Sequence, residues 1–152
     1  MTMKRFIRRC RGLRSERGAA LVEFALVVPF LMMIMCATID FGMAVFTLNN
    51  LTAAVREGGR YAAVLPQPGP SANDSRVINR VYGYIPATSN TGLTAIQVKA
   101  LITNTVPDPF NGNITVQITG YPYRPFTPLA SLIGLSTISL NRTAVFRWEF
   151  SS

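Results

Sequence analysis

The pattern of hydrophobic and polar positions divides the chain into an apolar N-terminal run and a mixed remainder. Residues 24–39 carry no charged side chain, and weakly polar residues extend the run from Ala19 to Leu48, interrupted only by Glu23 and Asp40. As a helix, the uncharged core rises roughly 24 Å, slightly less than a bilayer's hydrocarbon core of roughly 30 Å. The pattern therefore predicts a membrane-spanning helix.

The two acidic residues of this run lie roughly 25 Å apart along such a helix. We therefore expect Glu23 and Asp40 near opposite membrane interfaces, where a charge is inexpensive to accommodate. Pro29 falls inside the helix. It removes one backbone hydrogen bond and clashes with the preceding turn, which predicts a kink or local unwinding.

The helical pattern continues beyond the membrane. Apolar and small residues recur at spacings of three and four, which is typical of an amphipathic helix: Phe41, Val45, Leu48, Thr52, Val55, Gly59 and Ala62. Three prolines after Val64 end the pattern. The sequence thus predicts one helix over about 20–64, with its second half packed against the rest of the chain.

Two short helices are predicted next. One covers about 76–84, with Asn73 or Ser75 as its N-cap. The other begins at a capping box, Thr94 to Gln97, and continues through apolar residues to Ile102, where a strand is the alternative.

Alternation of apolar and polar residues then predicts two strands. They are "NITVQITGYPY" at 113–123 and "STISLNRTAVFRWEF" at 136–150, in which Phe146 and Trp148 should face the long helix as core residues. The expected fold class is α+β: a long N-terminal helix, transmembrane in its first half and amphipathic in its second, packed on a small antiparallel β-sheet with one or two short helices.

Charge is concentrated at the N-terminus. The net charge is +8, and seven basic residues against Glu16 give residues 1–18 a charge of +6, which leaves +2 for the remainder. This distribution argues against nucleic acid as a partner. It places the N-terminus in the cytoplasm and the C-terminal part outside. An ordinary secretory signal or an uncleaved anchor would explain these features equally well.

Candidate chemistry is sparse. The chain has no histidine, its seven carboxylates are scattered, and neither a phosphate-binding glycine loop nor a nucleophile motif is present. We therefore expect no enzymatic activity, no cofactor and no metal.

Gly18-Ala-Ala-Leu-Val-Glu23-Phe24 resembles the processing site of type IV prepilins, in which a basic leader ends in glycine and a glutamate follows five residues later. The stretches "RGAALVEFALVVPFL" and "DFGMAVFTLNNLTAAVREGGRYAAV" extend the resemblance over about 17–64, to the TadE-like minor pilins of the tight-adherence (Flp, type IVb) pilus system. Two features depart from this resemblance. Asp40 stands where a transmembrane helix would favour a neutral residue, and the segment 73–93 is longer than a minimal member of the family would need.

The resemblance implies that a prepilin peptidase cuts between Gly18 and Ala19. It also implies that Glu23, beside Phe24, pairs with the new terminal ammonium of a neighbouring subunit and sets the register of assembly. The chain then divides into a cleaved leader, 1–18, a transmembrane half-helix, 19–48, and an extracytoplasmic TadE-like domain, 49–152. The transmembrane part includes Phe24, Pro29 and Ile39.

The cluster from Arg56 through Gly58 and Gly59 to Tyr61 has two readings. The resemblance favours a packing hinge between the long helix and the sheet, which would include Phe146 and Trp148. The alternative is a solvated helix face with two small residues that admit close approach.

The resemblance also implies partners and a location. The partners would be the prepilin peptidase, other pilins and minor pilins, the inner-membrane assembly platform and the lipid bilayer. The protein would cross the bacterial inner membrane once, with its domain in the periplasm, and take part in building an adhesive pilus for surface adhesion and biofilm formation. Whether it enters the filament stays open. The alternative is an uncleaved single-pass membrane anchor that carries an extracytoplasmic binding module.

Overall fold

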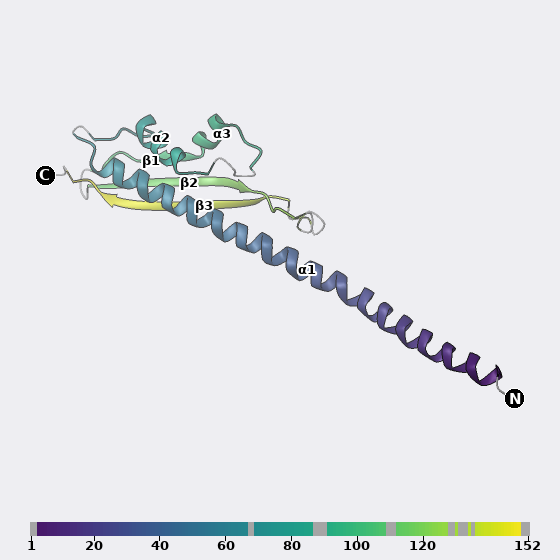
Figure 1. The fold of residues 1–152 in the computed structure, drawn as a ribbon. Coiled ribbons are helices and arrows are strands. Elements are labelled where there is room, and N and C mark those ends of the chain that lie inside the picture. The colour runs from purple at the N-terminus through teal and green to yellow at the C-terminus, as the bar shows by residue number, and fades with distance from the viewer. Residues whose placement is uncertain are drawn as a thin grey trace. The chain divides into compact units, whose positions relative to one another are not determined.

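The computed structural model describes residues 3–66, 69–86, 91–108, 112–127, 130, 134 and 136–149, with side chains from residue 18 onward. Helix α1 runs over Met3–Ala63, α2 over Ser75–Gly83 and α3 over Ala95–Ala100 (Figure 1). The strands are β1, Ile102–Asn104, β2, Asn113–Tyr123, and β3, Ile138–Arg147. The predicted α+β class is confirmed.

The chain forms two compact units, Met1–Ile39 and Asp40–Ser152. In the first unit, α1 stays helical through Pro29, so the predicted local unwinding does not occur there. The second unit holds the remainder of α1, the two short helices and the sheet. We call the second unit the domain.

The sheet is antiparallel, with the strand order β1-β2-β3. Both predicted strands are confirmed, and Ile114 lies opposite Phe146 in their register. The register shifts between Ile118 and Tyr121, where Gly120 adopts a left-handed φ of 72°. Such a shift is typical of a β-bulge, in which glycine tolerates a backbone that other residues avoid.

The short helices begin at polar caps. Thr94 and Gln97 form the predicted capping box at the start of α3. The helix ends at Ala100 and strand β1 begins at Ile102, so the segment contains both the predicted helix and the alternative strand. The predicted cap of α2 is wrong. Its N-cap is Asp74, whose side chain accepts a hydrogen bond from the backbone N–H of Arg76. Asn73 instead supplies the turn, with a left-handed φ of 53°.

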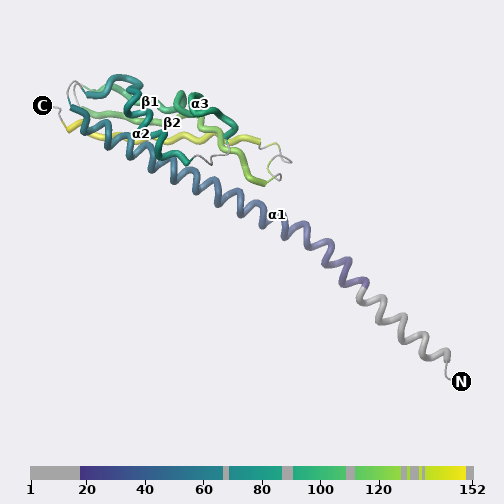
Figure 2. The backbone as a smooth tube through the Cα atoms, turned by 45° about the horizontal axis from the view of Figure 1, so that its top comes forward, coloured from purple at the N-terminus to yellow at the C-terminus, as the bar shows by residue number. Residues whose placement is uncertain are grey.

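The core lies on one face of the sheet. The second half of α1 runs along this face in both views (Figures 1 and 2). Helix α2 packs beside it, because Gly58 of α1 faces both Val81 of α2 and Val116 of β2. The central buried side chains come from all three elements: Leu51, Val55, Val77, Val81, Ile114, Val116 and Ile118. On the opposite face, Gln117 and Thr143 are exposed.

The buried face of α1 differs from the predicted stripe at its start. Leu51, Ala54 and Ala62 are buried, whereas Phe41 and Val45 are exposed. The predicted spacing therefore holds only from about residue 48 onward. In the turns just after Asp40, Ala44 packs against the edge of the core, but the larger side chains of Phe41 and Val45 do not reach it.

Candidate functional site

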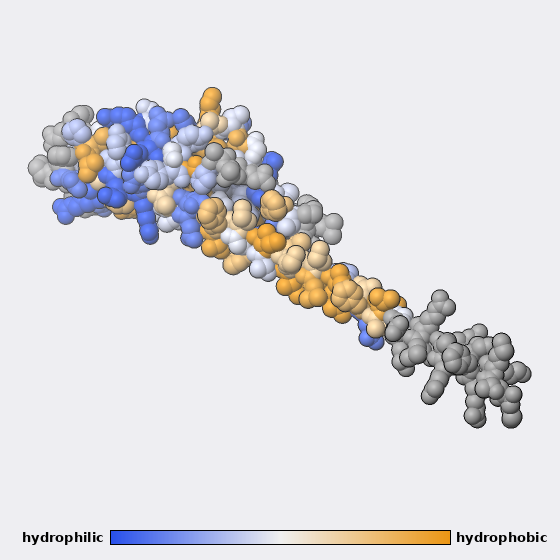
Figure 3. Space-filling model, viewed as in Figure 1, coloured by the Kyte–Doolittle hydropathy of each residue, from blue (hydrophilic) through white to orange (hydrophobic). Residues whose placement is uncertain are grey.

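The apolar part of α1 before Asp40 is exposed. Large side chains from Leu21 to Ile39 are exposed, and none of the most apolar stretch of α1 is buried within the chain. Figure 3 shows hydrophobic side chains gathered along this helix. Within the described residues, α1 is the one helix long and apolar enough to cross a membrane. It is a candidate membrane anchor.

The predicted processing and register residues lie at the start of this exposed stretch. Gly18, Ala19, Glu23 and Phe24 are all exposed. A Cβ atom on Gly18 would meet nothing within 4 Å. Among the side chains that the structure describes, no cation forms an ion pair with Glu23. A second molecule could therefore reach this end of the helix without displacing a contact.

Gly58 and Gly59 lie where α1 approaches its neighbours most closely, and both are buried. A Cβ atom on Gly58 would lie 2.1 Å from Cγ2 of Val81, and one on Gly59 would lie 2.2 Å from Cδ2 of Phe146. Real Cβ atoms do not approach other atoms so closely. The two glycines thus bring the backbone of α1 against α2 and β3.

The rest of this cluster lies toward solvent. Arg56 is exposed and Tyr61 is half-buried. Glu57 between them accepts a hydrogen bond of 2.6 Å from Arg80 of α2, whose guanidinium also lies 5.9 Å from the ring centroid of Tyr61. Solvent-exposed ion pairs contribute little to stability, so this contact orients the two side chains more than it stabilises the fold.

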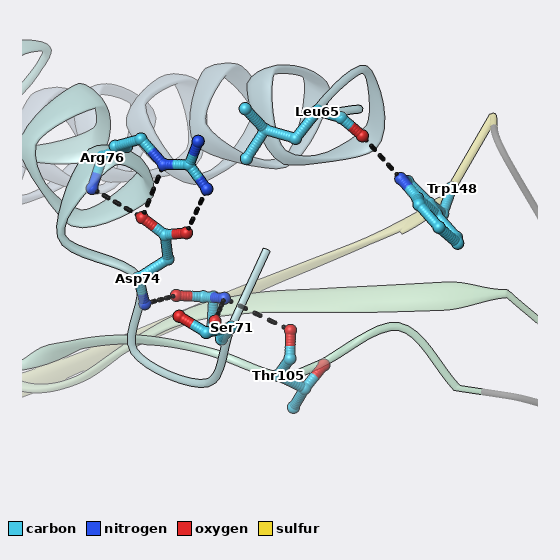
Figure 4. Close-up of polar contacts among 7 residues, drawn as sticks. Leu65, Ser71, Asp74, Arg76, Thr105 and Trp148 are labelled. Carbon is cyan, nitrogen blue, oxygen red and sulfur yellow. Dashed lines mark hydrogen bonds and ion pairs between the residues drawn. The ribbon is translucent and has the colours of Figure 1, made fainter. Parts of the chain in front are cut away.

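Trp148 follows β3 and packs, half-buried, against the core. Its indole Nε1–H donates a hydrogen bond of 2.9 Å to the carbonyl of Leu65, just beyond α1 (Figure 4). The ring lies against Gly69, where a Cβ atom would be only 3.1 Å from Cζ2 of Trp148, and the left-handed φ of 80° at Gly69 itself disfavours other residues. Trp148 therefore ties the end of the sheet to the end of the long helix.

A polar network fixes the start of α2 (Figure 4). The Asp74 carboxylate accepts hydrogen bonds from the backbone N–H and the guanidinium of Arg76 at 2.8–3.1 Å. The side-chain hydrogen bond from Arg76 lowers the pKa of Asp74, against the opposing effect of burial. Asn104 of β1 accepts from Asp74 N–H and donates to the carbonyl of Ser71, both at 2.8 Å. The network thus anchors the α1–α2 connection to the sheet edge.

Asp40 is a site residue whose partners sequence reasoning did not find. Its carboxylate accepts hydrogen bonds from the backbone N–H groups of Phe126 and Thr127, each at 2.9 Å, and from the Thr127 hydroxyl. The Tyr123 hydroxyl donates to the Asp40 carbonyl at 3.0 Å. The only sequence signal was an acid that interrupts an apolar run. Nothing in the spacing identified a loop more than 80 residues away as its partner.

The described residues hold no cluster of three or more histidine, cysteine or carboxylate side chains suited to a metal ion. The candidate functional features are instead an exposed apolar helix, a close helix–sheet contact and the hydrogen bonds that join Asp40 to Phe126 and Thr127. None of these brings together groups for acid–base or nucleophilic chemistry.

These features define the class: a protein with one candidate membrane-anchoring helix that continues into a small α+β domain and packs on its sheet. Residues 18–60 match the family model described as TadE-like protein, which confirms the resemblance seen in the sequence over this segment. This segment is therefore similar to TadE-like proteins, a family associated with the tight-adherence pilus system. No curated protein and no solved structure gives a significant match.

Proposed function

We propose that the chain is a minor pilin or pseudopilin that takes part in assembling a tight-adherence pilus. The observation that carries this proposal is the extent of the family match, which begins at Gly18, the residue after which cleavage is expected. The leader before it is strongly basic, and the helix after it is apolar and exposed. In this proposal the protein supports surface adhesion and biofilm formation as a structural component.

Processing by a prepilin peptidase would remove residues 1–18 and leave Ala19 as the new N-terminus. The new ammonium would then lie close in sequence to Glu23, at the same end of the apolar helix. A buried ion pair adds little net stability, because removing two charges from water is costly. It is effective at setting register, since any other stagger of neighbouring helices leaves a charge unpaired in an apolar bundle.

The domain would remain on the periplasmic side and present its surface to other pilins and to the inner-membrane assembly platform. Its own contacts support this part of the proposal. Helix α1 runs from the candidate anchor into the domain, where the Gly58–Gly59 approach packs it against α2 and β3.

The mass of the mature protein, measured in strains with and without the prepilin peptidase, tests the proposal. We expect a mature chain that starts at Ala19 only where the peptidase is present. The alternative, an uncleaved single-pass anchor carrying a binding module, predicts the same intact mass in both strains. Intact mass in both strains would therefore reject the pilin proposal.

A further inference from the structure

The loop at 124–127 is fastened to α1 at the level of Asp40. Hydrogen bonds from Phe126, Thr127 and Tyr123 all end on this one residue. They come from a segment more than 80 positions later in the chain. The loop is thus held against the first turn of α1 that belongs to the domain.

This loop presents an aromatic side chain to the outside. Phe126 is 71% exposed, although its backbone is held in place. With Met43, Phe46, Tyr123 and Arg124 it lines one end of a groove of about 510 Å³ between α1 and the end of β2, whose lining also includes Thr47, Asn50 and Thr91. We call these five residues the Phe126 groove. Phe41, in the same turns of α1 but not part of the groove, is 73% exposed. Clustered exposed apolar side chains mark a contact surface rather than a solvated face.

The position of the groove along the chain indicates what it contacts. Asp40 directly follows the uncharged run 24–39 of the candidate anchor. If this run and its flanks cross the hydrocarbon core, Asp40 lies at the outer boundary. Residues 41–46 then extend about 9 Å further, enough to pass through a headgroup region about 5–8 Å deep.

We propose that the Phe126 groove is a second membrane contact, through which the domain rests in the outer headgroup region of the bilayer that its helix crosses. Phe126, held at the level of Asp40, lies at the boundary with the acyl chains, Phe46 lies further out among the headgroups, and the Arg124 guanidinium meets lipid phosphates. This inference rests on the membrane anchoring in the proposed function. It does not depend on cleavage after Gly18.

The chemistry of the groove fits a phospholipid surface. Aromatic side chains and an arginine are typical of membrane interfaces, where one end of the side chain is apolar and the other is wet. Among the described residues no acid lines the groove, and the carboxylate of Asp40, beside the loop, already accepts three hydrogen bonds. The hydrogen bonds that hold the loop thus also prepare Asp40 for a site close to lipid phosphates.

Spin labels on the full chain test this inference. Cys10→Ser and Cys36→Ala remove the native thiols, and single cysteines then replace Phe126, Phe30 or Val145. Phe30 reports on the anchor. Val145 is the matched control, because it is apolar and 58% exposed. It lies far from the groove along β3, since the groove residue Tyr123 pairs with Ile138 at the other end of that strand. The chains are reconstituted in vesicles of equal phosphatidylethanolamine and phosphatidylglycerol, and collisions with oxygen and a water-soluble nickel chelate are recorded.

We expect the labels at 126 and 30 to favour oxygen over the nickel chelate, and the label at 145 to show the reverse. Adding Asp40→Ala, which releases the loop, should shift only the label at 126 toward water. A label at 126 that behaves like the one at 145 overturns the inference while leaving the anchor intact. A label at 126 shielded from both reagents also overturns it, because the groove would then face protein. Water exposure at Phe30 rejects the anchor itself and, with it, this inference.

Discussion

A Cβ atom on Gly59 of α1 would lie 2.2 Å from Cδ2 and 2.4 Å from Cε2 of Phe146 on β3. The ring of Phe146 therefore occupies the space that any side chain at residue 59 would need. Phe146 is half-buried and follows the register of the predicted last strand. The absence of one side chain on the helix thus lets an aromatic ring on the sheet reach the helix backbone.

We predict that Gly59→Ala destabilises the domain by about 1–2 kcal/mol. Overpacking a well-filled contact costs about 1–3 kcal/mol, and the better helix propensity of alanine returns up to about 1 kcal/mol. Urea unfolding of the full chain in detergent, followed by Trp148 fluorescence, measures the change.

The control for this prediction is Gly83→Ala, because a Cβ atom on Gly83 meets nothing within 4 Å. It should leave stability unchanged or raise it slightly. Combining Gly59→Ala with Phe146→Leu should recover part of the loss, since the smaller side chain makes room. If Gly59→Ala is as harmless as Gly83→Ala, the close approach of α1 to β3 is wrong.

Acid should weaken the domain through Asp74. Its pKa is lowered from the ordinary value of 3.8, chiefly by the hydrogen bond from Arg76. A lowered pKa in the folded state means that the stabilisation is complete above the ordinary pKa and is lost as the pH falls through the lower, folded value. Asp74→Asn keeps a good N-cap but cannot titrate, so it should remove this part of the acid dependence. Asp74→Ala should also lose the cap, at about 1 kcal/mol near neutral pH.

Unfolding midpoints of the three proteins, measured from neutral pH down to acid, check these outcomes. Asn104→Ala is a useful comparison, because it removes the contact to the sheet edge but leaves the carboxylate in place. It should lower stability without changing the slope with pH. An unchanged acid slope in Asp74→Asn would contradict the assigned origin of the pKa shift.

Trp148 should contribute in two separable ways. Trp148→Phe keeps an aromatic ring but leaves the Leu65 carbonyl without its indole donor, which should cost about 1 kcal/mol. Trp148→Ala also removes the ring that covers Gly69 and should cost about 3 kcal/mol, the low end for an aromatic truncation, because the side chain is half-buried. Thermal unfolding by circular dichroism measures both. Equal losses for the two variants would show that the ring contributes no packing.

Much of the fold was accessible from the sequence because local patterns specify it. The alternation around Ile114 and the capping box at Thr94 each require only neighbouring residues, and both are confirmed. The cap of α2 was misplaced because Asn73, Asp74 and Ser75 are all good capping residues. The choice of Asp74 depends on Asn104, which binds its backbone from another strand.

The site was predictable only in part. Gly18 and Glu23 were proposed as site residues because their spacing resembles a known motif, and the family match begins at the first of them. The hydrogen bond between Asp40 and Thr127 joins residues 87 positions apart, and the sequence carries no periodic pattern that would indicate it. Phe41 and Val45 were predicted to continue the packed stripe, but the domain core begins further along α1. Hydrophobic spacing cannot distinguish a side chain that meets a core from one that meets lipid.

Processing should require a small residue at the expected cleavage site. We predict that Gly18→Val blocks maturation, because a β-branched side chain beside the scissile bond hinders access to the backbone. The substitution should not disturb the fold, since a Cβ atom on Gly18 meets nothing within 4 Å. Immunoblot mobility in strains with and without the prepilin peptidase measures the outcome. Normal shortening of the variant in the peptidase-positive strain would show that Gly18 is not required for cleavage.

Glu23 should separate assembly from cleavage. The peptidase should depend mainly on Gly18 and the leader, whereas assembly should depend on the carboxylate. We therefore predict that Glu23→Gln is still processed but that pili become scarce. Glutamine keeps the size of the side chain, yet it cannot neutralise the Ala19 ammonium of a neighbour in an apolar bundle, and a charge left unpaired there costs several kcal/mol.

Mature mass and surface pilus abundance are measured together, with Glu57→Gln as a control that alters a carboxylate of the domain. A plain anchor predicts easier insertion and unchanged function for Glu23→Gln. Normal processing with normal pili would make Glu23 an interfacial acid without a role in register.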